Sequence, residues 1–403
     1  MMIGYGFRPT TPSLLGMGAH ARTTRWLNSA SLGDYSDTDV RDGTFAPGDK
    51  FPVIAATFES IRRWVRQWTD YPDGSVALLD STTAACDAAM LALAADRDVF
   101  LYTSHAHPTI RQSVRRTAEL VGRIRRQHVV AREVDLDGLN LGSQSVLADA
   151  IADRIAQTVG TAPAVVVLEH VTYKHGLHVP IAQVLERLAE RRPLTKVIID
   201  GAQAVGIWRP PSVPFAAYLG CFHKFVCAQP GTAFLLIDPQ FGNQLQAHVK
   251  AVCDLPRADT AYVVQTLDLE KWNRTAEHLA AQHAISGLSK RQSLVRGFND
   301  ALDAALFPRV ISLGRDHDPA LRSHISSVPF ASADSARAAF AAAARNGYVV
   351  QQIEDHVRIT AGRDARREWG TAIGRILDLP ADRAPDPSVL HQVDGRREES
   401  RRS

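Results

Sequence analysis

Residues 197–203 read Val-Ile-Ile-Asp-Gly-Ala-Gln and give the clearest indication of the fold class. Three consecutive β-branched residues, with no polar residue between them, are typical of a strand that is buried on both faces. The run ends at Asp200, and a carboxylate is costly to bury unless it meets a cation or a strong hydrogen-bond donor. Asp200 therefore either caps the following turn or binds a positively charged group of a ligand.

Similar apolar runs on both sides of this stretch predict further buried strands. They are residues 76–79, 99–102, 165–168 and 233–237. Helical patterns separate the runs, at residues 84–95, 109–126 and 181–191, and an amphipathic helix around residues 58–68 precedes them. Alternation of short buried strands with helices predicts an α/β fold with a mostly parallel sheet.

Composition divides the chain into four parts. Residues 1–50 are rich in Gly, Pro, Thr and Asp and predict an irregular N-terminal arm, and residues 51–240 predict the large α/β domain. Residues 241–390 predict a helical connection and a small α+β domain, in which the helix Ser335–Arg345 ends at Asn346-Gly347. Residues 391–403 are charged, have no apolar anchor, and predict a disordered tail.

Charge and composition exclude several classes of protein. The 403 residues include 46 Lys and Arg against 43 Asp and Glu, and 45% are hydrophobic, which is ordinary for a globular protein. The net charge of +3 gives no reason to expect a nucleic-acid or membrane partner. Four cysteines are too few for a disulfide framework or a cysteine-based zinc site. Because no signal-peptide pattern or membrane-spanning run is present, we expect a cytoplasmic protein.

A hydroxyl-rich loop follows the first predicted strand. Residues 79–85 read Leu-Asp-Ser-Thr-Thr-Ala-Ala and open a helix. The side chains of Ser81, Thr82 and Thr83 either cap this helix or bind a phosphate at its positive N-terminus. Since the chain has no Gly-x-Gly-x-x-Gly or Gly-Lys-Ser/Thr motif, dinucleotide-binding and P-loop sites are not indicated.

A lysine between aromatic residues lies in residues 220–225, Gly-Cys-Phe-His-Lys-Phe. Desolvation of Lys224 there would favour a nucleophilic amine, whereas a lysine that only extends to solvent is the simpler interpretation. Ligands of open parallel sheets bind at the carboxyl ends of the strands. The order of the segments is therefore more specific than any one of them: hydroxyl loop, Asp200 with Gln203, then His223-Lys224.

In this order the segments resemble the fold-type I enzymes that use pyridoxal 5'-phosphate (PLP), specifically the class V aminotransferase family, which includes cysteine desulfurases and isopenicillin-epimerase-like proteins. The resemblance runs from residues 26–33 to residues 357–360. Its most specific parts are the Asp-Gly-Ala-Gln and His-Lys segments. It implies a homodimeric enzyme that binds PLP and acts on a small amino-acid-like substrate.

The resemblance also implies roles for the matched residues. Lys224 would form a Schiff base with the cofactor, Asp200 would pair with the pyridinium nitrogen, and His107 would stack on the ring. Gln203 and Tyr173 would approach the phenolic oxygen. The phosphate would be held by Ser81, Thr82, Thr83, His223 and, across the subunit boundary, Thr266. The substrate would be bound by Arg358, whose two-donor fork suits a carboxylate, and by Asn28 and Ala30.

Departures from the family pattern bear on the reaction. Desulfurases carry a persulfide-forming cysteine in their C-terminal part, but no cysteine follows Cys253, so we do not expect a cysteine desulfurase. Tyr173 stands where desulfurases carry Asn, and Cys221 stands where many relatives carry a phosphate-binding Ser. Transamination is the leading prediction, because it needs only Lys224, the supported ring and a carboxylate clamp. The alternatives are a lyase that eliminates a carbon–sulfur bond, an epimerase, and a binding protein that has lost catalysis.

Two groups of histidines are candidates for metal ligands: His105 with His107, and His170 with His175 and His178. No cysteine or acidic residue recurs at ligand spacing near either group, and the resemblance assigns His107 to the cofactor. We therefore expect no metal site.

Overall fold

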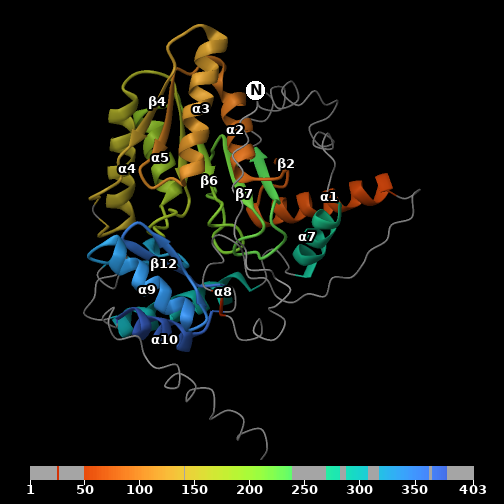
Figure 1. Ribbon diagram of the computed structural model, residues 1–403. Helices are drawn as coiled ribbons and strands as arrows, with labels where there is room; N and C mark the ends of the chain where they lie inside the picture. Colours follow the sequence, from red (N-terminus) through yellow and green to blue (C-terminus); the bar gives the residue numbers. More distant parts are fainter. Residues whose placement is uncertain are drawn as a thin grey trace, which may run out of the picture.

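A computed structural model describes residues 25–26, 50–139, 141–237, 269–281, 287–306, 317–362 and 365–378. Within these ranges a seven-stranded sheet and a three-stranded sheet lie in different halves of the molecule (Figure 1). The large sheet has the order β2-β8-β7-β6-β5-β3-β4, and the small one has the order β11-β12-β9. The predicted α/β fold class is confirmed.

The large sheet is mostly parallel, as predicted. Its strands are β2 (Ser75–Leu79), β3 (Val99–Thr103), β4 (Val130–Val134), β5 (Ala164–Glu169), β6 (Thr195–Asp200), β7 (Ala217–Cys221) and β8 (Ala233–Ile237). Only β8 runs antiparallel to its neighbours, β2 and β7. The other pairs are parallel, so the carboxyl ends of β3, β5, β6 and β7 meet at one edge.

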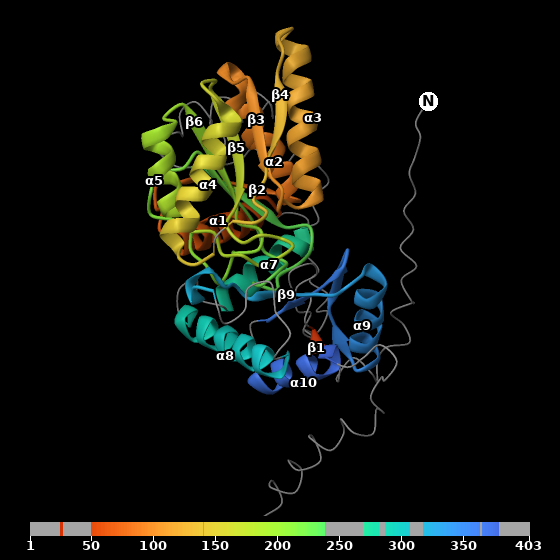
Figure 2. The same cartoon turned by 90° about the vertical axis from the view of Figure 1, so that its left-hand side faces the viewer.

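Helices cover both faces of the large sheet. One face carries α2 (Thr82–Leu93), followed by the short helix η3 (Ala94–Asp96), and α3 (Pro108–Arg125). The other carries α1 (Lys50–Thr69), α4 (Gln144–Val159) and α5 (Ile181–Arg191) (Figure 2). Along β5, Val165 and Val167 pack with α2 and α3, whereas Val166 and Leu168 pack with the opposite layer. Both faces of each central strand are therefore buried, which explains the continuous apolar runs.

The smaller half is built on a second core, to which Ile207 and Phe225 of the larger half also belong. Its elements are α8 (Leu288–Leu306), η5 (Pro319–Leu321), β9 (Ile325–Pro329), α9 (Ala333–Arg345), β10 (Tyr348–Val349), β11 (Gln351–Ile353), β12 (His356–Thr360) and α10 (Arg367–Asp378). Helices α8 and α10 approach closely at Gly370, where an added Cβ would lie 2.4 Å from the carbonyl oxygen of Phe298. The Ala-rich helix ends at Arg345 as predicted, and Gly347 follows with a φ of 75°.

Two further elements connect distant parts of the chain. Strand β1 (Arg25–Trp26) pairs in parallel with β10, and α7 (Leu269–Ala281) packs on α1. The rings of Phe58 and Trp272 meet edge-on at 5.6 Å between α1 and α7. A segment near the start of the sequence thus joins the smaller half, and a segment from residues 269–281 joins the larger half.

The predicted domain boundaries stay predictions. Nearly all of the predicted arm (residues 1–50) and the whole of the predicted tail (residues 391–403) lie outside the described residues. In the ranges that the structure covers, no helix combines the length and the apolar character needed to cross a membrane.

Candidate active site

The carboxyl ends of β6 and β7 bring Asp200 and Lys224 together. Asp200 is the last residue of β6, and Lys224 lies three residues beyond the end of β7. Asp200 is 7% exposed, and its Oδ1 accepts a hydrogen bond from the Ala202 N–H at 2.9 Å. Burial raises the pKa of Asp200, and the charge of Lys224 opposes this effect. Asp200 is thus a buried carboxyl group, and the Lys224 amine lies close enough to affect its pKa.

The hydroxyl loop lies at the N-terminus of α2. Ser81 is the N-cap, and its Oγ accepts a hydrogen bond from the Ala84 N–H at 3.1 Å, so the capping interpretation holds for this residue. Thr82 and Thr83 are half-buried and form the start of the helix. Because the first N–H groups of a helix have no partner within it, this end can also bind an anion.

Two buried polar atoms near Lys224 lack partners in the described structure. They are Nδ1 of His223 and Oε1 of Gln203, a residue that is only 5% exposed. Burying such atoms without a hydrogen bond costs free energy, so both atoms have hydrogen-bonding capacity left for a polar ligand. Burial raises the pKa of the Cys221 thiol, but His223 and Lys224 outweigh this effect, and the pKa lies below its usual value.

His107, Tyr173 and Arg358 form a second group. The rings of His107 and Tyr173 meet edge-on with centroids 4.4 Å apart. Burial lowers the pKa of His107 to about 4, helped by Lys224 and Arg358, so its ring is neutral at neutral pH. His107 is the N-cap of α3, where its Nδ1 accepts a hydrogen bond from the Thr109 N–H.

Arg358 reaches this group from β12 in the small sheet. It is fully buried, its Nη1 donates to the Tyr173 carbonyl at 2.9 Å, and its guanidinium lies 4.5 Å from the centre of the Tyr173 ring. Its Nη2 donates to Oε1 of Gln351. Burial lowers the pKa of Arg358 to about 10, which leaves it charged at neutral pH. The Tyr173 hydroxyl accepts a hydrogen bond from Gln351 Nε2 at 2.8 Å, and its role toward a phenolic oxygen stays a prediction.

Sequence reasoning missed Glu169, the last residue of β5, which pairs in register with Asp200. It is 2% exposed, and the Thr103 hydroxyl donates to its Oε2 at 2.5 Å. Burial raises the pKa of Glu169 to about 8, Thr103 opposes this, and the nearby Asp200 charge adds to it. The signal was present, because the run at residues 165–168 ends in an acidic residue just as the run before Asp200 does.

A hydrogen-bond chain, also missed, leads from buried Tyr218 on β7 to the smaller half. The Tyr218 hydroxyl lies 3.0 Å from His170 Nδ1, His170 Nε2 lies 3.3 Å from His178 Nε2, and His178 Nδ1 lies 3.0 Å from the Ala320 carbonyl oxygen. A carbonyl only accepts, so His178 donates from Nδ1. His178 Nε2 then accepts from His170, and Tyr218 donates to His170. Burial lowers the pKa of both histidines, which supports the neutral forms.

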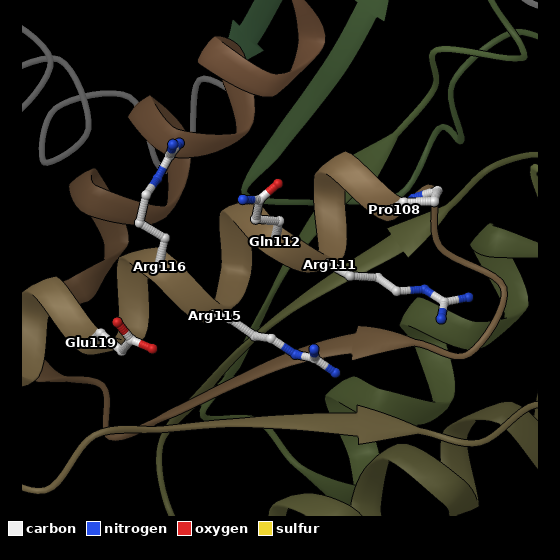
Figure 3. Close-up of a pocket in the computed structure, with 6 residues that line it drawn as sticks. All are labelled: Pro108, Arg111, Gln112, Arg115, Arg116 and Glu119. Atoms are coloured by element: carbon white, nitrogen blue, oxygen red, sulfur yellow. The ribbon is translucent and has the colours of Figure 1, made fainter. Parts of the chain in front are cut away.

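A surface hollow of about 470 Å³ begins beside His107 (Figure 3). It is lined by residues of α3: Pro108, Arg111, Gln112, Arg115, Arg116 and Glu119. Its three arginines already donate hydrogen bonds within the protein, to the Ala106 carbonyl, the Tyr102 hydroxyl and the Asp87 carboxylate. We therefore do not assign an anion site to this hollow.

Three predicted residues, Asn28, Ala30 and Thr266, lie outside the described residues. The remaining predicted residues follow the strand ends of the large sheet, apart from Arg358, which lies on β12 of the small sheet. Their proposed roles stay predictions.

No family model matches the sequence, and no curated protein matches it. Solved structures do match. One is the cystine C-S lyase C-DES in complex with its reaction product cysteine persulfide, at 16% identity and a TM-score of 0.70, covering 91% of this chain and 99% of that one. A second C-DES structure, a mutant with glycine covalently linked to the PLP cofactor, has 15% identity and a TM-score of 0.69, covering 93% and 100%.

An aspartate aminotransferase from Thermus thermophilus matches at 14% identity and a TM-score of 0.62, covering 89% of this chain and 96% of that one. Identities this low compare folds only. They show that the chain has the fold of the fold-type I PLP enzymes, as the sequence resemblance predicted.

Proposed function

We propose that this chain is a PLP-dependent enzyme that acts at Cα of an amino-acid-like substrate. The observation that carries the proposal is the position of buried Asp200 at the end of β6, close enough to Lys224 after β7 for the charge of the lysine to oppose the rise in pKa that burial causes. Solved structures of the same fold support it, since one of them holds a PLP cofactor.

The residues present fit this cofactor. Lys224 would bind it covalently, and Asp200 would accept a hydrogen bond from its ring nitrogen. The buried His223 Nδ1 would gain the partner that it lacks in the described structure. Ser81, Thr82, Thr83 and His223 would hold its phosphate. When bound, PLP supplies an acceptor for the electrons left at Cα when a bond there breaks.

The chain's own residues would divide the remaining work. The charged form of the buried Asp200 would be favoured by a protonated ring nitrogen of the cofactor. The Asp200 carboxylate would in turn keep that nitrogen protonated. The Lys224 amine would carry the proton to and from Cα. The neutral ring of His107 would cover one side of the site. Arg358 would bind the substrate carboxylate with its planar fork, held in position by the Tyr173 carbonyl and Gln351.

For the reaction itself we retain transamination as the leading proposal. It requires the fewest groups: an amine, a carboxylate that supports the ring nitrogen, and a carboxylate clamp. A lyase that eliminates a carbon–sulfur bond is the second candidate, supported by the full-length fold match to the C-S lyase C-DES. An epimerase is the other alternative that the sequence resemblance leaves open.

The cofactor proposal is tested by the visible absorbance of the purified chain. We expect a yellow protein whose band is lost on borohydride treatment, a colourless Lys224→Ala variant, and an unchanged band in Lys290→Ala, which alters an exposed lysine on α8. A band of normal intensity in Lys224→Ala would refute the covalent attachment.

The reaction is tested by mixing the yellow protein with single amino acids and sulfur conjugates. Conversion to the pyridoxamine spectrum without an added keto acid identifies an aminotransferase. Release of pyruvate with ammonia or sulfide identifies a lyase, and solvent deuterium at Cα without net reaction identifies an epimerase. We further propose a homodimer, for which sedimentation of the full chain is the test.

A further inference from the structure

Each of three segments of the candidate active site carries a histidine two residues away from a site residue. His105 precedes His107, His175 follows Tyr173, and His356 precedes Arg358. Two of these histidines converge with Asp137, from the turn after β4. One ligand atom from each of His105, Asp137 and His175 lies within 4.8 Å of the other two.

The contacts within this His-His-Asp cluster (His105, Asp137 and His175) are close. Nε2 of His105 lies 2.8 Å from Oδ1 of Asp137. The rings of His105 and His175 meet edge-on at 4.9 Å, and the ring of His356 lies 5.3 Å from that of His175. Three elements that are distant in sequence therefore present ligand-type atoms to one small volume.

The cluster has unused hydrogen-bonding capacity. His105 is 9% exposed, and its Nδ1 and that of His175 are both buried without a partner in the described structure. Buried polar atoms are nearly always hydrogen-bonded, so two such atoms in one cluster call for an explanation.

We propose that His105, Asp137 and His175 bind one divalent transition-metal ion of zinc-like chemistry, at a site separate from the residues assigned to PLP. Two imidazoles and a carboxylate are ligands that Zn²⁺ accepts, and three protein ligands leave one position for water or for His356. The Nδ1 of His356 lies 2.6 Å from Oδ1 of Asp355, the kind of support that ligating histidines usually have.

The ligand atoms would need to shift in two ways: the 2.8 Å contact between His105 and Asp137 would lengthen slightly, and atoms up to 4.8 Å apart would come closer. Ligand atoms of a tetrahedral zinc site are about 3.3 Å apart, given bonds of about 2 Å. The Asp137 side chain is 73% exposed and can move toward the histidines. Ligand spacing in the sequence does not point to Asp137, because this residue is 32 positions from His105 and follows a different strand.

A bound ion would join the loop after β3, the turn after β4 and the loop after β5. Two of these segments also carry His107 and Tyr173, so the ion would fix them relative to each other. The ion would not itself contact the residues proposed to react.

The test is a titration of the full-length chain, freed of metal with EDTA, with Zn²⁺ in a calorimeter. We expect one equivalent to bind, and a higher melting temperature when it does. Loss of a ligand in His175→Ala or Asp137→Ala should weaken binding by roughly 100-fold or more, since even residues that only support ligands contribute about 10- to 100-fold. His128→Ala, at an exposed histidine before β4, is the matched control and should bind as the parent does.

Asp137→Ala keeps the proposal testable if His175→Ala does not fold, because Asp137 is largely exposed. Binding of Co²⁺, followed by its visible absorbance, provides a second readout of the same ligands. Absence of stoichiometric Zn²⁺ binding, or unchanged affinity in Asp137→Ala, would overturn the proposal. Neither measurement depends on PLP, so a failure here is distinct from a failure of the proposed function.

Discussion

Replacing Glu169 with Gln should make the free energy of unfolding less dependent on pH. The folded chain raises the pKa of Glu169 from an ordinary value of 4.5 to about 8, chiefly because the carboxyl group is buried. Between these two values the folded state keeps a proton that the unfolded state has released. Stability therefore falls as pH rises through this window, and the Glu169 contribution is constant below and above it.

The size of the effect follows from the two pKa values. Each pH unit within the window contributes about 1.4 kcal/mol, so the interval from 4.5 to about 8 corresponds to a loss on the order of 5 kcal/mol. Gln has nearly the same shape, cannot ionise, and offers a carbonyl oxygen to the Thr103 hydroxyl. The variant should therefore escape most of this loss, and the difference between the two proteins includes the coupling of Glu169 to Asp200.

Urea unfolding near the two ends of the window, followed by tryptophan fluorescence, measures the difference. We expect the parent chain to lose several kcal/mol more than Glu169→Gln between the two conditions. Glu119→Gln, which alters a carboxylate that is 70% exposed on α3, should follow the parent. Parallel pH profiles for Glu169→Gln and the parent would refute the reasoning.

Three further substitutions test the site and the core. Arg358→Lys keeps the charge but loses the planar fork, and should raise KM by about 10- to 100-fold with a smaller change in kcat; an unchanged KM would contradict the clamp. Asp200→Asn removes the carboxylate partner of the ring nitrogen and should reduce turnover by about 100-fold or more. The amount of cofactor that remains bound after dialysis should also fall, and normal turnover would count against the role of Asp200. Trp68→Ala deletes a fully buried ring stacked on Trp64 at 6.0 Å and should lower stability by about 3–5 kcal/mol in urea unfolding; a loss below about 1 kcal/mol would contradict this packing.

Five strands of the large sheet were predictable because burial on both faces demands continuous apolar runs. Strand β7 was not predicted, although it is buried along its whole length, because Gly220 and Cys221 interrupt its apolar run. Strand β4 was not predicted, since it lies at the sheet edge and exposes Arg132 and Glu133.

Helix α4 was also not predicted, although Ser143 caps it by accepting a hydrogen bond from the Val146 N–H. The apolar face of α4, with Leu147, Ile151 and Ile155 at helical spacing, was nevertheless a usable signal in the sequence.

The site was predictable where its residues follow strand ends. The approach of Lys224 to Asp200 follows from the parallel order of β6 and β7. The contact between Arg358 and Tyr173, which are 185 residues apart, depends on how the two sheets pack and has no local signal. The pairing of His105 with Asp137 likewise joins two loops whose spacing in sequence says nothing about their distance in space.

In the hydrogen-bond chain Tyr218–His170–His178–Ala320, the donor of each hydrogen bond is fixed, because the last acceptor is a carbonyl oxygen. Tyr218 belongs to the large sheet, whereas Ala320 belongs to η5 of the smaller half. If the two halves separate, His178 loses its acceptor, and both imidazoles become free to exchange tautomers. Nitrogen-15 chemical shifts of these rings would then report in solution whether the two halves are in contact, without any attached label.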